Sequence, residues 1–153
     1  MDHLVDEIDR RILRNLQRDA SPSLDALAQA VVLSRNACWR RVKRLEEAGI
    51  IRARVAHLDA AKLGLGLTVF VMIRAGSHAP DWLSRFQRAV ATLPEVQGAY
   101  RTSGDLDYVL RVRVADVAGY DRFYKALIAQ VPVADVSASF VMEEIRETTE
   151  LPI

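Results

Sequence analysis

Cysteine is almost absent from this sequence: Cys38 is the single cysteine among 153 residues, so the chain forms no internal disulfide. The three histidines, His3, His57 and His78, are too scattered for the ligand spacing of a metal site. No apolar run approaches the ~18 residues of a membrane helix, and the start of the chain is too rich in charge for a signal peptide. We therefore expect no metal, no membrane partner and a cytoplasmic location.

Glycine and proline are also sparse, at 7 and 5 residues. Half of the chain is hydrophobic and 27% is charged, a balance typical of folded globular proteins rather than disordered ones. The length suits one domain or two small ones.

A strong overall charge is missing as well, because the net charge is only +1. The two parts of the chain nevertheless differ: residues 1–54 carry 11 Lys/Arg and 8 Asp/Glu, or +3, and residues 55–153 carry 10 and 12, or −2. Five cations lie between Leu33 and Leu45 with no acid among them: Arg35, Arg40, Arg41, Lys43 and Arg44. A patch of this kind attracts polyanions.

Apolar spacing predicts three helices in the first fifty residues. The first covers residues 4–18 with a cap near Asp6, and either Ser21 or Ser23 caps a second one that ends near Val31. Ser34 caps the third helix, which Gly49 terminates near residue 48.

Beyond residue 50 the pattern changes to alternation, which predicts a connecting strand over residues 51–57 and then a linker with one helical turn up to residue 66. Six elements follow: strand 67–75, helix 80–93, strands 95–102 and 107–114, helix 117–131 and strand 135–145. The order β-α-β-β-α-β predicts an α+β, ferredoxin-like domain. We therefore expect a helix-turn-helix domain (1–50), a strand and linker (51–66) and a ferredoxin-like domain (67–153).

The strand at 67–75 is apolar on both faces, since Val69 and Val71 alternate with Phe70 and Met72. Two helices cover only one face of a four-stranded sheet, so the other face needs a partner. A homodimer packed sheet to sheet satisfies this requirement.

The third helix carries the first candidate site. Cys38, Val42 and Leu45 recur at inward spacing, so Cys38 is interpreted as a core residue. The outward residues are of types that contact bases and phosphates in the major groove; with the cap residue they are Ser34, Arg35, Asn36, Trp39, Arg40 and Lys43. Trp39 has two interpretations, packing at the domain edge or contact with DNA.

The second candidate site is the segment 100–108. Taken by themselves, its residues favour an ordinary hairpin with solvated acids. The alternative is a pocket in which carboxylates and loop amides hold a small zwitterion.

Taken together, these motifs resemble the Lrp/AsnC (feast/famine) family of transcription regulators over nearly the whole chain. The matching stretches are residues 6–13, 27–28, 33–34, 41–46, 49–51, 104–108, 139–142 and 151–152. The resemblance implies a winged helix-turn-helix that binds promoter operators, with Arg44 added to the recognition-helix residues. It also implies dimers that often assemble into octamers and an amino acid bound at a loop and strand comprising Tyr100, Thr102, Gly104, Asp105, Asp107 and Ser139.

A closer similarity links the chain to the branch that responds to cysteine, on residues 38–39, 64–68, 120–124 and 142–145. One departure concerns Val32, where the family commonly has glycine: a left-handed valine would cost on the order of 1 kcal/mol, which favours a differently built turn.

Two other classes of function remain open on the residues alone. The first is a metabolic enzyme or its regulatory subunit; against it, the sequence shows no acid/base pair, no nucleophile with a partner and no phosphate-binding glycine loop. The second is an interaction protein whose basic helix faces an acidic partner.

Overall fold

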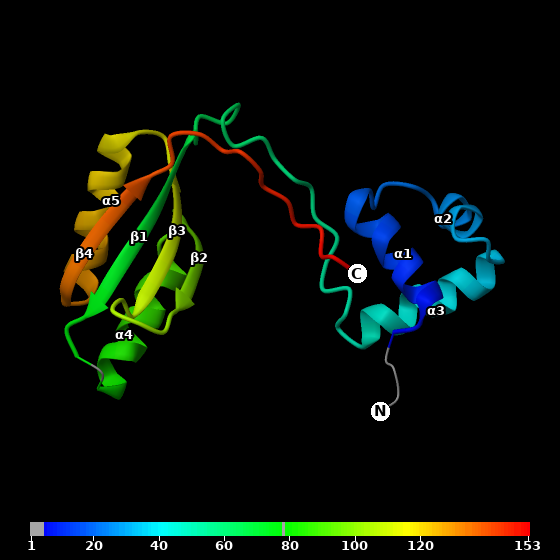
Figure 1. Cartoon of the computed structure of the whole chain (residues 1–153), viewed down its shortest axis with the longest axis horizontal. Coiled ribbons are helices and arrows are strands. Elements are labelled where there is room, and N and C mark those ends of the chain that lie inside the picture. Colours follow the sequence, from blue (N-terminus) through cyan, green and yellow to red (C-terminus); the bar gives the residue numbers. More distant parts are fainter. Residues whose placement is uncertain (1–4, 78) are drawn as a thin grey trace. The chain divides into compact units, whose positions relative to one another are not determined.

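The computed structural model describes residues 5–77 and 79–153, which fall into two compact units (Figure 1). The helical unit comprises the chain up to His57 together with residues 146–153, and the sheet unit comprises residues 58–145. The predicted helix start at Leu4, and the histidines at 3 and 78, lie outside the described residues.

Three helices form the helical unit, α1 (Glu7–Arg18), α2 (Leu24–Ala30) and α3 (Arg35–Glu47). Each begins where a side-chain oxygen accepts a hydrogen bond from a first-turn backbone N–H, and the caps are Asp6, Ser23 and Ser34. The three predicted helices are confirmed, and Ser23 is the serine that caps the second. Their core comprises Ile12, Leu27, Ala28, Val31, Cys38, Val42 and Leu45.

Helices α2 and α3 end in the same way, with a left-handed residue directly after the C-cap. After α3 this residue is Gly49, at φ +70°. After α2 it is Val32, at φ 58°, so the expectation of a differently built turn was wrong. The left-handed geometry lets Val32 N–H bond the Gln29 carbonyl (3.1 Å) and Leu33 N–H the Ala28 carbonyl (2.9 Å). These two bonds satisfy helix-end carbonyls and offset the strain of a β-branched residue there.

The predicted strand at residues 51–57 is absent, which corrects the sequence prediction. Residues 52–57 are exposed and form no strand, because a strand needs a neighbouring chain to complete its backbone hydrogen bonds, and no backbone ladder to them is found within the described part of the chain. The expected helical turn in the linker is present, with Leu63 N–H bonded to the Asp59 carbonyl at 3.3 Å.

The sheet unit has the predicted β-α-β-β-α-β order. Its elements are β1 (Leu67–Ala75), α4 (Pro80–Thr92), β2 (Val96–Arg101), β3 (Tyr108–Val114), α5 (Val117–Gln130) and β4 (Val133–Phe140). The strands form an antiparallel sheet in the order β2-β3-β1-β4. Both helices cover one face (Figure 1), where Val69, Val71 and Ile73 of β1 are fully buried against them.

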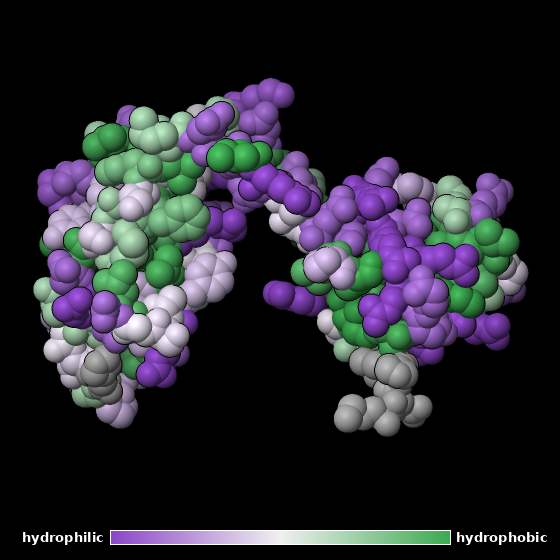
Figure 2. Space-filling model, viewed as in Figure 1, coloured by the Kyte–Doolittle hydropathy of each residue, from purple (hydrophilic) through white to green (hydrophobic). Residues whose placement is uncertain are grey.

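The other face of the sheet carries apolar side chains at the surface. Phe70 is 40% exposed and Met72 is partly buried. Figure 2 shows hydrophobic residues (green) over the strands on the face turned to the viewer. The prediction that β1 is apolar on both sides is confirmed.

Strand β4 ends at Phe140, five residues before the predicted end at residue 145. Phe140 pairs with Val69, and β1 itself begins only at Leu67. One more backbone hydrogen bond follows, from the Val141 N–H to the Thr68 carbonyl at 3.0 Å, and β1 has no residue before Leu67 to continue the ladder. Met142 and Ile145 are 94% and 91% exposed.

The end of the chain, which the sequence assigns to the ferredoxin-like domain (67–153), packs against α1. The Leu151 N–H donates to Gln17 Oε1 (2.9 Å), and Gln17 Nε2 donates to the Leu151 carbonyl (3.0 Å). Arg18 pairs with Glu150 at 3.3 Å. Residues 146–153 therefore belong to the helical unit.

Candidate DNA-binding and effector sites

The outward face of α3 carries polar and aromatic side chains that the helical core leaves exposed. Because Cys38, Val42 and Leu45 are buried against α1 and α2, the opposite side of the helix faces solvent. All of the predicted recognition residues on it are exposed: Ser34, Arg35, Asn36, Trp39, Arg40, Lys43 and Arg44. The structure thus gathers them on one helix.

The cations of this face are only loosely engaged. Arg35 approaches Asp25 at 3.4 Å and Lys43 approaches Glu47 at 3.7 Å, and all four side chains are more than half exposed. For Arg40, no ion pair occurs within residues 5–77 and 79–153. Exposed ion pairs contribute ~0–1 kcal/mol to stability, so these side chains can exchange their present partners for a ligand at little energetic cost.

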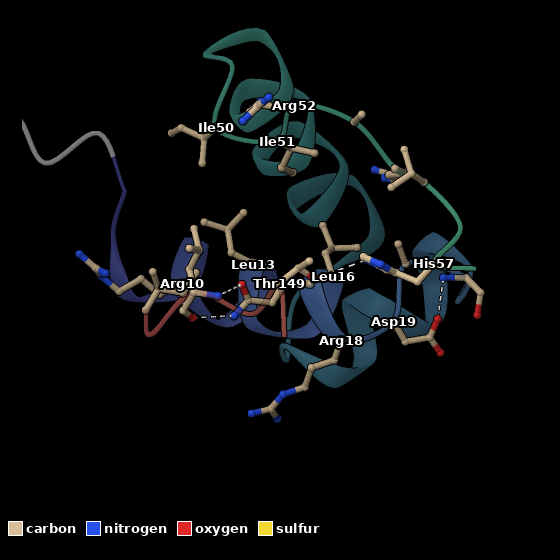
Figure 3. A pocket seen from close by; sticks show the side chains of 18 of the residues that line it. Arg10, Leu13, Leu16, Arg18, Asp19, Ile50, Ile51, Arg52, His57 and Thr149 are labelled. Atoms are coloured by element: carbon tan, nitrogen blue, oxygen red, sulfur yellow. Dashed lines mark hydrogen bonds between the residues drawn. The ribbon is translucent and has the colours of Figure 1, made fainter. Parts of the chain in front are cut away.

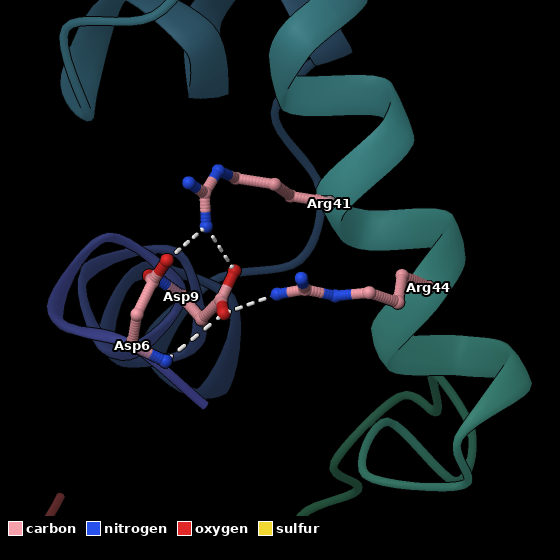
Figure 4. Close-up of polar contacts among 4 residues, drawn as sticks. All are labelled: Asp6, Asp9, Arg41 and Arg44. Atoms are coloured by element: carbon pink, nitrogen blue, oxygen red, sulfur yellow. Dashed lines mark hydrogen bonds and ion pairs between the residues drawn. The ribbon is translucent and has the colours of Figure 1, made fainter. Parts of the chain in front are cut away.

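Two other cations of the basic segment have an internal role, shown in Figure 4. Arg41 Nη1 donates to Asp6 Oδ2 (2.7 Å) and to Asp9 Oδ1 (2.9 Å), and Arg44 Nη2 donates to Asp9 Oδ2. Asp9 is fully buried. The hydrogen bond from Arg41 lowers the pKa of Asp6 to about 2.

Asp6 and Asp9 also close the capping box of α1. Asp9 N–H donates to Asp6 Oδ1 at 2.8 Å, and Asp6 N–H donates to Asp9 Oδ2 at 3.1 Å. Asp9 was not predicted as a partner of the basic helix, although its spacing of three from the predicted cap residue Asp6 is a sequence signal for a capping box. The structure thereby engages Arg44, a predicted DNA-binding residue, in holding α1 to α3.

The candidate effector hairpin connects β2 to β3. Thr102 Oγ1 donates to the Leu106 carbonyl (2.7 Å), and Thr102 N–H donates to the Asp107 carbonyl (2.9 Å). Gly104 has φ +116°, a conformation that L side chains rarely adopt. The structure therefore brings Thr102, Gly104, Asp105 and Asp107 together in one tight loop.

Within this loop, Asp107 contacts the neighbouring strand. Its Oδ2 accepts a hydrogen bond from the Ala75 N–H at 2.7 Å, and its own N–H donates to the Ile73 carbonyl at 3.0 Å. These bonds fasten the loop to the end of β1. Asp105 lies exposed at the tip.

Tyr100 lies on β2 next to the loop and is 56% exposed. Its ring lies over Gly98: a Cβ built at residue 98 would come within 2.6 Å of the Tyr100 hydroxyl. The lack of a side chain at Gly98 therefore leaves room for the Tyr100 ring.

Ser139 lies away from the other predicted effector residues. It is exposed on β4 and pairs with Phe70, whereas the hairpin contacts β1 at Ile73 and Ala75. Three residues of strand separate Phe70 from Ile73, or roughly 10 Å, and β1 lies between β4 and β3. A single chain does not bring Ser139 to the hairpin.

A groove with a volume of about 840 Å³ lies in the helical unit (Figure 3). Leu13 and Leu16 of α1 line one side, with Ile50 and Ile51 on another, and the last residues of the chain complete it. No predicted site residue lines this groove. The groove forms because residues 52–57 and residues 149–153, which are far apart in sequence, both lie beside α1. A local sequence pattern cannot predict such a long-range arrangement.

Neither a metal-ligand cluster nor a membrane-spanning helix occurs among the described residues. Among residues 5–77 and 79–153, no three His, Cys, Asp or Glu side chains are grouped so as to hold a metal ion. In the same part of the chain, no helix is both long and apolar enough to cross a bilayer.

Comparison with known proteins gives two family matches. Residues 5–52 match the winged helix-turn-helix DNA-binding model, and residues 68–151 match the Lrp/AsnC ligand binding domain. The chain is 50% identical over 151 residues to the DNA-binding transcriptional activator DecR of Escherichia coli K12, covering 98% of this chain and 99% of that protein.

Solved structures give the same picture. An AsnC family transcriptional regulator from Agrobacterium tumefaciens has a TM-score of 0.94 and 52% identity, covering 97% of both chains. A transcriptional regulator from Neisseria meningitidis, solved in complex with L-Met, has a TM-score of 0.92 and 34% identity, covering 97% of this chain and 96% of that one.

A winged helix-turn-helix followed by an α+β ligand-binding domain defines a ligand-responsive transcriptional regulator. The chain belongs to the Lrp/AsnC family of such regulators, as its motifs predicted. This family consists of regulators and not of enzymes, so the enzyme alternative is excluded.

Proposed function

We propose that α3 enters the major groove of promoter DNA and that a free amino acid, bound at the β2–β3 hairpin, changes the oligomeric state or the DNA affinity of the protein. The observation that carries the proposal is the outward face of α3, where Arg35, Asn36, Trp39, Arg40 and Lys43 are all exposed. No metal or other cofactor enters the proposal, and the protein acts in the cytoplasm.

The N-terminus and the side chains of α3 support contact with phosphates as well as bases. Its N-terminus carries the positive end of the helix dipole and has no acidic residue in its first turn. Arginine and lysine pair with guanine and phosphate, and asparagine pairs with adenine. Because Arg44 is bound to Asp9, we assign it a supporting contact at most, to a phosphate.

The test for DNA binding is an electrophoretic shift with the promoter of the protein's own gene. Arg35→Ala combined with Arg40→Ala should weaken binding, by about 1 to 3 kcal/mol for each residue that contacts a base. Lys125→Ala is the matched control, since Lys125 is an exposed cation on α5. Unchanged affinity of the double variant would refute the groove assignment.

The hairpin supports binding of a zwitterion through complementary charge. Asp105 supplies a carboxylate for the ammonium group, and the loop amides around Gly104 supply donors for the carboxylate. Asp107 already bonds Ala75, so its contribution is to shape the loop. Ser139 could join the site only from another copy of the chain.

Two candidates for the effector have specific support. Cysteine follows from the resemblance to the cysteine-responsive branch. Methionine follows from the Neisseria meningitidis regulator, which was solved in complex with L-Met. Calorimetric titration with cysteine, methionine, leucine and asparagine separates them. Asp105→Ala should abolish binding, while Asp121→Ala, which removes an exposed carboxylate on α5, should not.

The open sheet face supports a dimer, which is the unit from which an octamer would assemble. Phe70 at its centre is 40% exposed, and burial of this face in a second copy would remove it from water. Phe70→Lys should reduce the mass measured by light scattering, whereas Ile128→Lys, at a side chain on α5 that is 39% exposed, should leave it unchanged. Equal masses for both variants and the parent would contradict the proposed interface.

A further inference from the structure

Trp39 is an anomaly on the basic face of α3. Its side chain is 51% exposed, although tryptophan is normally largely buried. Within the described residues its ring contacts no other aromatic ring, and the aromatic pairs all lie in the sheet unit. The helical core is complete without it, because Cys38 and Val42 on the inner side are the residues that pack. The stability of the helical unit therefore does not explain this side chain.

The surroundings of Trp39 identify its partner. On a helix, residues four apart are neighbours, so Trp39 lies between Arg35 and Lys43 in one row. Asn36 and Arg40 form the adjacent row. An apolar surface enclosed by cations and an amide suits a polyanion that also presents an apolar group, and it does not suit an apolar protein or a lipid tail.

The major groove of DNA presents one such group. Among the base edges exposed there, the C5-methyl of thymine is the apolar one, and all the others are hydrogen-bond donors or acceptors. We propose that Trp39 packs against a thymine methyl group in the operator and thereby adds a sequence preference that Arg35, Asn36 and Arg40 do not supply. This proposal rests on the DNA-binding function proposed above.

Replacement of thymine by deoxyuridine tests the contact, because it removes the methyl group and leaves the hydrogen-bonding pattern of the base unchanged. The probe is a duplex selected from a random pool by the full-length protein, with each thymine replaced in turn. Removal of one buried methyl should lower the affinity about fourfold per half-site at the contacted position. At the other thymines the affinity should not change.

Variants then assign the effect to the side chain. Trp39→Ala should bind the thymine and deoxyuridine duplexes equally, whereas Trp39→Phe, which keeps an apolar ring, should retain discrimination. Arg40→Ala should weaken binding to both duplexes by the same factor and keep their ratio. Thermal unfolding of Trp39→Ala should match the parent, because the side chain is half exposed.

The outcomes separate this proposal from the function on which it rests. If the parent protein selects no sequence from the pool, the proposed DNA-binding function fails. If it selects one but tolerates deoxyuridine at every position, or if Trp39→Ala still discriminates, only the thymine contact is overturned.

Discussion

The outward face of α3 and the β2–β3 hairpin use their polar side chains in opposite ways. On α3, Arg35 and Lys43 have only exposed, loose partners. In the hairpin, Thr102 and Asp107 form short hydrogen bonds to backbone groups. Backbone hydrogen bonds, the buried side chains and the capping residue hold α3 in shape. Its outward side chains are therefore available for a ligand. A six-residue turn has no core, and part of its binding chemistry is used to hold the loop.

Two other cations of α3 are engaged in the way that the hairpin residues are. Arg41 and Arg44 are bound to Asp9, so one basic segment contains both structural and available cations. Four comparisons test this division between side chains that hold the structure and side chains that remain available, and the backbone geometry next to α3.

The largest effect is expected for Asp9→Ala. The change leaves Arg41 and Arg44 without their shared buried partner and opens the capping box, so unfolding in urea should show a loss of about 2 to 4 kcal/mol, somewhat below the range for a fully buried pair since Arg44 is half exposed. Asp25→Ala removes an exposed pair with Arg35 and should cost less than about 1 kcal/mol. Equal losses would show that the ion pairs of Asp9 and of Asp25 contribute equally to stability.

A second test separates the two acids of the hairpin. Asp107→Ala leaves the partly buried Ala75 N–H without this acceptor and should destabilise the sheet unit by about 1 to 3 kcal/mol. Asp105→Ala should change stability by less than about 0.5 kcal/mol and act on effector binding alone. Thermal unfolding and calorimetric titration of both variants measure the two quantities. A stability loss in Asp105→Ala that matched Asp107→Ala would contradict the division.

The third substitution concerns the strained turn before α3. Val32→Gly removes a left-handed β-branched residue, a gain of about 1 to 2 kcal/mol, and makes the unfolded chain more flexible, a loss of about 0.4 to 1 kcal/mol. A net stabilisation of about 0 to 1.6 kcal/mol in urea unfolding is expected. Val55→Gly, at an exposed position without positive φ, should show only the loss. Destabilisation by Val32→Gly would mean that the left-handed backbone conformation of Val32 costs less than the added flexibility of the unfolded chain.

The smallest effect is a pH dependence carried by Asp6. The pKa of this residue is about 2 in the folded protein against 3.8 ordinarily, because of the hydrogen bond from Arg41. A lowered folded pKa adds stability above the ordinary pKa, which is lost as the pH falls from about 4 towards 2. The urea midpoint of the parent should fall more steeply over this interval than that of Asp6→Asn, which keeps the cap. Parallel curves would assign the acid sensitivity to other groups.

Local patterns predicted most of the fold. The caps at Asp6 and Ser34, the stop at Gly49 and the order of the six elements in the sheet unit all depend on residues close together in sequence, and all are confirmed. Among the site residues, the outward positions of α3 followed from the 3.6-residue period.

Long-range contacts could not be predicted in the same way. The pairing of Asp9 with Arg41 and Arg44, and of Gln17 with Leu151, joins residues that are separated by 32 or more positions. Val32 misled the sequence argument for a different reason: its intrinsic preference opposes positive φ, but two hydrogen bonds at the end of α2 outweigh that preference. The strand predicted at 51–57 had the correct alternation, but no neighbouring strand pairs with it among the residues that the structure describes.

The packing of residues 146–153 on α1 means that the contacts of the helical unit form at two separate stages of synthesis on the ribosome. The helical unit is discontinuous in sequence, because the whole sheet unit lies between its first 57 residues and its last eight. At roughly 5–20 residues per second, synthesis of the intervening chain takes on the order of 10 s. During this interval Gln17 has no Leu151 to bond, so the helices acquire these contacts only after the sheet unit has been made.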